Sequence, residues 1–128
     1  MTFSTCQTVH QPRWHDSMNE LANAGSVLLI EASEALSLLD PRPGVQTVVI
    51  THRRLLSATM LQTVQPDVIV APLIASSWDL VDLAATLDRL GYRGIVCALT
   101  RPLPRGELIV SELSSLYPTL SFRLLEAA

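Results

Sequence analysis

Short apolar runs bounded by turn residues recur along this chain, and segments with helical periodicity separate them. The clearest run spans residues 66–72 and reads PDVIVAP in one-letter code. A run of this length and composition is typical of a strand that is buried on both faces of a sheet. Runs of the same kind predict further strands at residues 26–31, 45–50, 95–100 and 120–125. Because it lies mid-chain, we predict that the 66–72 segment is the central strand.

The segments between these runs carry apolar residues at helical spacing. Residues 78–90 give the clearest pattern, in which Leu80, Leu83 and Leu87 lie on one stripe. Ser77 is placed to cap this helix and Gly91 to end it. The same periodicity predicts helices at residues 33–39, 53–64 and 107–116.

A further helix is predicted before the first strand, at residues 16–24. Ser17 and Glu20 have the spacing of a capping box, and Gly25 follows as a stop signal. Residues 1–15 form a polar leader without periodicity, which we expect to be loose. Residues 16–128 are predicted to form a single domain.

Strands that alternate with helices and short loops favour right-handed crossovers and a parallel sheet. The fold class is therefore predicted to be α/β, a three-layer sandwich with helices on both faces of a five-stranded parallel sheet. The chain ends almost directly after the fifth predicted strand. We therefore expect no helix after that strand.

Composition and charge narrow the classes of function. The formal net charge is −3, all nine basic residues are Arg, and no basic stripe is visible. This pattern disfavours a nucleic-acid partner. No apolar run approaches the roughly 20 residues that span a bilayer, and the first residues do not resemble a signal peptide. We expect a cytoplasmic protein without a membrane partner.

Metal and cofactor sites are not predicted. Cys6, His10, His15 and Asp16 are potential zinc ligands, but their spacing matches no closed four-ligand pattern. Cys97 lies within an apolar run and is predicted to be a small core residue.

Three stretches resemble the receiver domain of bacterial response regulators. Residues 27–36 resemble that family's first strand and its acidic end, residues 66–70 resemble the beginning of its third strand, and residues 94–100 resemble its fourth strand, which ends in a switch hydroxyl. The resemblance covers about residues 26–125. It implies a flavodoxin-like sheet with strand order 2-1-3-4-5.

The same resemblance implies that the family's phosphate chemistry is absent here. That chemistry needs an aspartate at the end of the third strand to accept phosphate, and a lysine after the fifth strand to pair with it. The aspartate position falls on Pro72, or on Ala71 in a shorter register, and neither side chain is a nucleophile. The lysine position falls near Leu125, and the chain contains no Lys.

The family's acidic pair, which holds Mg²⁺, is also incomplete. Glu31 is present after the first strand, but Ala32 follows it. Thr100 matches the switch hydroxyl. The degenerate receiver pocket is thus expected to consist of Glu31, Ala32, Ala71, Pro72 and Thr100.

Basic residues follow two of the predicted strands. His52, Arg53 and Arg54 follow the second strand, and Arg101 follows the fourth. In open α/β sheets, ligands bind beyond the carboxyl ends of the strands. These four residues are therefore a candidate anion site, and a small-molecule or anion-binding domain is the alternative function. A solvated helix start explains the same residues without a ligand, because no Gly-rich phosphate loop precedes them.

Catalysis is not predicted. Glu31 and His52 can be paired as acid and base at the strand ends, but a lone surface carboxylate and an exposed histidine are the better explanation. Ser33, Ser76 and Ser77 lack the glycine-flanked elbow of a serine nucleophile and are predicted to be helix caps.

The expected function is a non-catalytic signalling or scaffold module that acts by protein–protein interaction. The fifth strand is predicted to be a sheet edge, and exposed edges favour pairing with another chain. Receiver-like domains commonly dimerise on this side, so a homodimer or another protein partner is expected. The predicted interface residues are Leu108, Glu112, Phe122 and Leu124.

Overall fold

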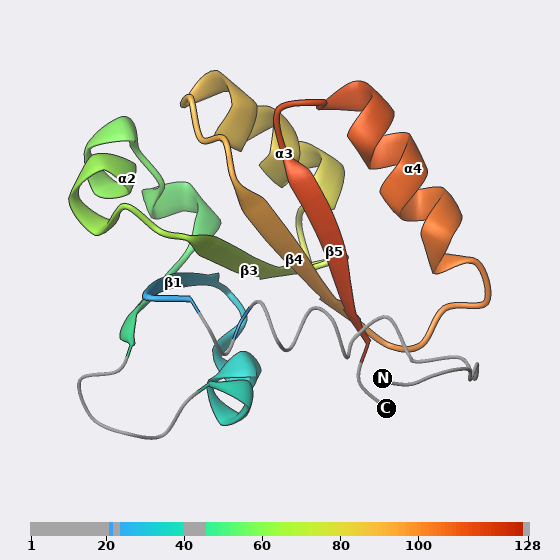
Figure 1. Cartoon of the computed structure of the whole chain (residues 1–128), viewed down its shortest axis with the longest axis horizontal. Helices are drawn as coiled ribbons and strands as arrows, with labels where there is room; N and C mark the ends of the chain where they lie inside the picture. The colour runs from blue at the N-terminus through green and yellow to red at the C-terminus, as the bar shows by residue number, and fades with distance from the viewer. Residues whose placement is uncertain (1–20, 22–23, 40–45, 127–128) are drawn as a thin grey trace, which may run out of the picture.

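A computed structural model describes residues 21, 24–39 and 46–126 of this chain. The strands are β1 (Ser26–Ile30), β2 (Thr47–Thr51), β3 (Val68–Pro72), β4 (Ile95–Thr100) and β5 (Ser121–Glu126). They form one parallel sheet in the order β2-β1-β3-β4-β5 (Figure 1). The predicted order 2-1-3-4-5 and the central position of the third strand are confirmed.

The helical segments are η1 (Ser33–Leu38), η2 (Arg53–Leu55), α2 (Ala58–Val64), α3 (Leu80–Arg89) and α4 (Gly106–Leu116), of which η1 and η2 are 3-10 helices. The predicted single helix at 53–64 is wrong. Leu56 is extended, and the Ser57 hydroxyl accepts a hydrogen bond from the Met60 amide, which starts a new helix at Ala58.

Two predicted caps are also wrong. Ser33 is the first residue of η1, and Ala32 precedes that helix without a side-chain cap. Ser77 lies in a turn before α3, which is closed by the hydrogen bond from the Ala75 amide to the Trp78 carbonyl at 2.8 Å. Asp79 caps α3 instead.

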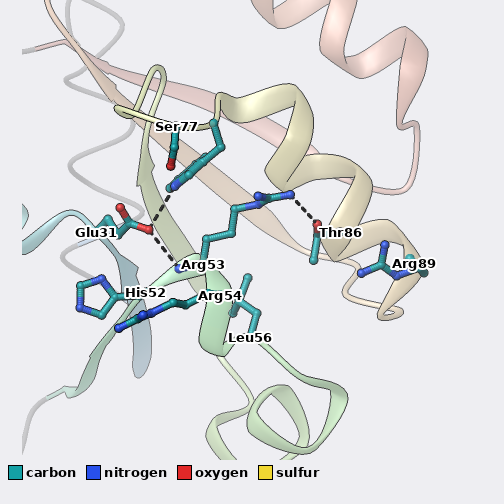
Figure 2. Close-up of a pocket in the computed structure, with 9 residues that line it drawn as sticks. Glu31, His52, Arg53, Arg54, Leu56, Ser77, Thr86 and Arg89 are labelled. Atoms are coloured by element: carbon teal, nitrogen blue, oxygen red, sulfur yellow. Dashed lines mark hydrogen bonds between the residues drawn. The ribbon is translucent and has the colours of Figure 1, made fainter.

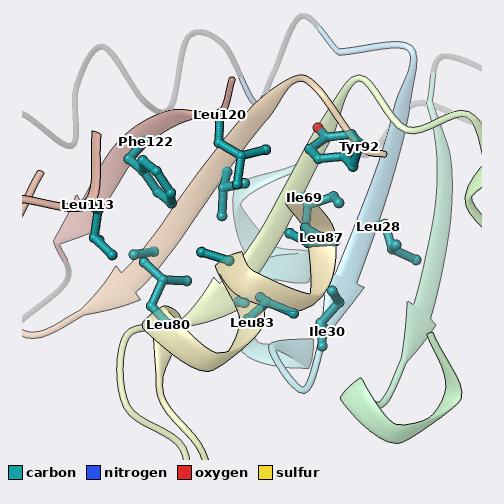
Figure 3. Packing of buried hydrophobic residues seen from close by; sticks show 14 of the residues in the cluster. Leu28, Ile30, Ile69, Leu80, Leu83, Leu87, Tyr92, Leu113, Leu120 and Phe122 are labelled. Atoms are coloured by element: carbon teal, nitrogen blue, oxygen red, sulfur yellow. The ribbon is translucent and has the colours of Figure 1, made fainter. Parts of the chain in front are cut away.

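The two faces of the sheet carry separate apolar clusters. Alternate strand residues point to the face that α2, α3 and α4 cover, while η1 lies on the other face (Figure 1). Leu28, Ile69 and Phe122 pack with Leu83 and Leu87 of α3 in the first cluster (Figure 3). The second cluster contains residues of η1 and the fully buried side chain of Cys97, as predicted.

The beginnings of two strands are joined by a side chain. The Oδ2 atom of Asp67, just before β3, accepts hydrogen bonds from the backbone amides of Gly25 at 2.9 Å and Ser26 at 3.1 Å. The Ser26 hydroxyl in turn donates to the Val64 carbonyl at 3.0 Å. These bonds join the start of β1 to the start of β3 and to the end of α2.

Part of the predicted interface is wrong. Phe122 and Leu124 of β5 are both 3% exposed, because their side chains pack beneath α4 in the same cluster as Leu113. They are not available to a partner. Leu108 and Glu112 on α4 are exposed, as predicted.

The predicted leader at 1–15 and most of the predicted helix at 16–24 lie outside the described residues, as do Cys6, His10, His15 and Asp16. Leu21 is helical and fully buried in the second cluster. Among the described residues, none of the helices is sufficiently long and apolar for a bilayer crossing.

Candidate functional site

The residues predicted to form a degenerate receiver pocket lie at the carboxyl ends of β1, β3 and β4, and those at the end of β3 are apolar. Ala32 and Ala71 are fully buried, and Pro72 is half-buried. Ala71 pairs with Ala98 of β4, and Pro72 with Leu99. The position at the end of β3 thus presents neither a nucleophile nor a metal ligand.

The other end of this pocket carries a carboxylate where the receiver resemblance implies a lysine. Leu125 faces the second cluster and is 1% exposed. The next residue, Glu126, pairs with Thr100 and accepts a hydrogen bond from the Leu103 amide at 2.8 Å. The Thr100 hydroxyl donates to the Arg101 carbonyl at 3.1 Å. A negative charge beside Thr100 would repel a phosphoryl group.

Glu31 has a structural role at the end of β1. Its backbone adopts a left-handed conformation with φ of 52°, which turns the chain out of the strand. Its Oε2 atom accepts hydrogen bonds from the Trp78 indole at 3.1 Å and from the Arg53 amide at 3.2 Å. The carboxylate therefore links β1 to the loop before α3 and to η2, and Trp78 is held in the core at 7% exposure.

A hollow of about 480 Å³ lies beside this link, between η2 and α3 (Figure 2). It is open on one side and lies beyond the carboxyl ends of β1 and β2. Its lining residues are Glu31, His52, Arg53, Arg54, Leu56, Ser77, Trp78, Thr86 and Arg89.

Arg53 crosses this hollow. Its Nη2 atom donates to the Thr86 hydroxyl of α3 at 3.4 Å, and its guanidinium carbon is 5.8 Å from the centre of the Trp78 ring. Figure 2 shows Arg53 extending toward Thr86, and Arg54 extending in the opposite direction, toward His52. The Nε–H of Arg53 is buried and has no hydrogen-bond partner within the described part of the chain.

The remaining basic groups of the hollow are exposed. Among the described residues, Arg54 and Arg89 form no ion pair or side-chain hydrogen bond, and the His52 ring forms none with Glu31. The acid–base pair of Glu31 and His52 is thus not assembled in this structure. Three guanidinium groups and one already engaged carboxylate make the hollow electropositive.

The structure brings together three of the four residues predicted for an anion site. His52, Arg53 and Arg54 line the hollow, whereas Arg101 follows β4 and does not. Sequence reasoning missed Thr86 and Arg89. They are three residues apart on α3, beside its buried stripe, and nothing in their spacing indicates that this side of the helix faces η2.

No protein-family model, curated protein or solved structure matches this chain. Its function has to be inferred from its own geometry.

Proposed function

We propose that this protein is a pseudo-receiver: a non-catalytic signalling or scaffold module that acts by binding protein and does not accept a phosphoryl group. The observation that carries the proposal is the combination of a receiver-like strand order with Pro72 at the acceptor position. Phosphoryl transfer needs a nucleophile and a positive environment for the transferred group. Ala71, Pro72 and Glu126 supply neither.

The surface of α4 supports the protein-binding part of the proposal. Leu108 and Leu116 are each more than half exposed, and Glu112 lies between them at helical spacing. Exposed apolar side chains at this spacing give a helix face that a partner can contact. We infer that this face, called here the α4 stripe (Leu108, Glu112 and Leu116), contacts the partner or a second copy of the chain.

We also propose that a helix before β1 packs on the second face of the sheet, which would complete a three-layer sandwich. Leu21 is helical and fully buried on the face that η1 only partly covers. The Gln46 side chain donates to the carbonyls of Leu21 at 2.7 Å and Ala24 at 2.8 Å, which ties the chain before β1 to the start of β2. These contacts support an N-terminal helix that packs on the second face of the sheet.

The proposal that this protein does not accept a phosphoryl group is tested by incubating the full chain with acetyl phosphate and Mg²⁺ and measuring its intact mass. The expected result is an unchanged mass, while a phosphorylatable receiver domain treated in parallel gains a phosphoryl group. An acid-labile gain of one phosphoryl group on this chain would overturn the proposal.

A further inference from the structure

The geometry points to the hollow between η2 and α3 as a binding site for a small phosphate monoester. This site is separate from the α4 stripe and shares only Glu31 with the predicted receiver pocket, so it does not depend on the proposed function. The occupant would lie against η2 and α3, beyond the carboxyl ends of β1 and β2, where open α/β sheets bind ligands.

The charge of the hollow fits a dianion. Arg53, Arg54 and Arg89 line it together with one carboxylate, Glu31, which leaves an excess of two positive charges. A phosphate monoester carries a charge of about −1.5 to −2 at neutral pH. Since none of the three guanidinium groups is ion-paired among the described residues, a ligand anion would not have to displace a carboxylate from them.

The hydrogen-bonding state of Arg53 supports a ligand at this position. Arg53 has one long side-chain hydrogen bond, to Thr86, and its Nε–H is buried without a partner within the described residues. Buried polar groups are rarely left unsatisfied in folded proteins. An oxyanion that draws the guanidinium toward the opening lets Nε and one Nη donate together, which is the bidentate geometry that arginine forms with phosphate.

The number of donors favours phosphate over carboxylate. The Ser77 and Thr86 hydroxyls and the His52 ring line the hollow in addition to the guanidinium groups. A carboxylate offers two oxygens to these donors, whereas a phosphate monoester offers three terminal oxygens. The hollow of about 480 Å³ has the size of a small-molecule site, and Leu56 gives the organic part of the ligand an apolar contact.

A second hollow of similar size gives an internal comparison. It measures about 490 Å³, lies near the ends of α2 and α3, and has Arg93 as the charged residue among its described lining residues. Volume alone therefore does not distinguish the two hollows. The distinguishing property is the concentration of guanidinium and hydroxyl groups in the first one.

The proposal is tested by following the backbone amide resonances of the full chain by NMR during titration at constant ionic strength. The ligands are glycerol 3-phosphate, inorganic phosphate and acetate. We expect saturable shifts at residues 52–54, 77, 86 and 89 with glycerol 3-phosphate, and none with acetate. Tighter binding of glycerol 3-phosphate than of inorganic phosphate would identify a phosphorylated small molecule as the ligand class. Equal affinity would mean that the site recognises the phosphate group and not the organic part, and the monoester assignment would be wrong.

Two matched variants distinguish specific binding in the hollow from nonspecific attraction of anions to arginine residues. Arg89→Gln is expected to weaken glycerol 3-phosphate binding about tenfold, because it removes one charge-assisted contact. Arg101→Gln, which removes another exposed arginine outside the hollow, is expected to leave the affinity unchanged. Both positions are exposed, so neither variant should unfold the chain. Equal weakening by the two variants, or shifts that do not saturate at millimolar ligand, would overturn the proposal.

Discussion

Tyr92 is a buried polar residue whose hydroxyl forms a hydrogen bond within the fold. It lies at 9% exposure between α3 and β4, and its hydroxyl donates to the Ile95 carbonyl at 2.9 Å. A Cβ on Gly94 would lie 2.6 Å from that hydroxyl oxygen, so only glycine permits the two residues to pack this closely. Burial raises the pKa of the Tyr92 hydroxyl, with smaller contributions in the same direction from Cys97 and Asp67.

This environment predicts a loss of stability in alkali. The neutral hydroxyl is favoured in the folded chain, so its stabilising effect is complete below the ordinary tyrosine pKa of 10.0 and is lost as the pH rises above it. Above about pH 10 we expect the free energy of unfolding to fall by up to about 1.4 kcal/mol per pH unit through this residue. Urea unfolding of the wild type and of Tyr92→Phe from about pH 9 to about pH 11 measures the difference.

Tyr117→Phe is the matched control for this experiment, because it removes the other tyrosine of the chain. The control should keep the pH dependence that Tyr92→Phe loses. If Tyr92→Phe kept the same slope as the wild type, Tyr92 would not be neutral and buried in the core.

At the scale of single elements, α3 shows how a helix start is chosen. Asp79 accepts a hydrogen bond from the Asp82 amide, and Asp82 accepts one from the Asp79 amide, both at 3.0 Å. This capping box satisfies two backbone donors that the helix itself leaves free. Asp79 pairs with Ile74 in an antiparallel bridge, and the Leu80 amide donates to the Leu73 carbonyl at 2.9 Å, so the backbone before Leu80 is held outside the helix.

A pair of substitutions tests this assignment. Asp79→Ala is expected to lower the free energy of unfolding by about 1 kcal/mol, because it removes the helix cap. Ser77→Ala is expected to change it by less than about 0.5 kcal/mol, since the Ser77 side chain caps nothing. Urea denaturation of the two variants gives the comparison. A larger effect from Ser77→Ala than from Asp79→Ala would contradict the observed helix start.

The same element shows why helix boundaries were harder to predict than strand order. The apolar stripe of α3 and the run at β3 depend on local periodicity, which the chain displays directly. The start of α3 and the break between η2 and α2 depend on contacts with distant residues or on competition among several capping residues. Ser77 and Asp79 are both good caps, and the contacts that accompany the start at Asp79 are the bridge between Asp79 and Ile74 and the bond between Trp78 and Glu31, which local periodicity does not show.

At the scale of the whole molecule, the candidate site was predictable only in part. Arg53 and Arg54 follow β2, and the rule that ligands lie beyond strand ends was sufficient to select them. Arg101 satisfies the same rule but lies apart from the hollow, since it follows β4, while β1 and β3 lie between β4 and β2 in the sheet. Arg89 enters the site through the packing of α3 against η2, and that packing is not encoded in local spacing.

For the predicted interface too, the sequence pattern indicated which residues are apolar but not which of them other elements cover. The alternation of β5 indicates one apolar face, but not whether that face is covered. In the structure α4 covers it, and Phe122 and Leu124 are consequently buried. Of the four predicted interface residues, Leu108 and Glu112 stay exposed, and they belong to the α4 stripe, in which Leu108 and Leu116 are 54% and 57% exposed.

The last prediction is that the full chain forms a homodimer through the α4 stripe. Leu108→Arg replaces one of the two exposed apolar side chains of the stripe with a charge and is expected to weaken self-association at least about tenfold. Leu55→Arg is the matched control, because Leu55 is 53% exposed but lies on η2, away from α4. Sedimentation equilibrium of the three proteins measures the association. Dimers of the wild type and Leu55→Arg with a monomeric Leu108→Arg would support the stripe. A monomeric wild type, or equal weakening by both substitutions, would exclude it as the self-association surface.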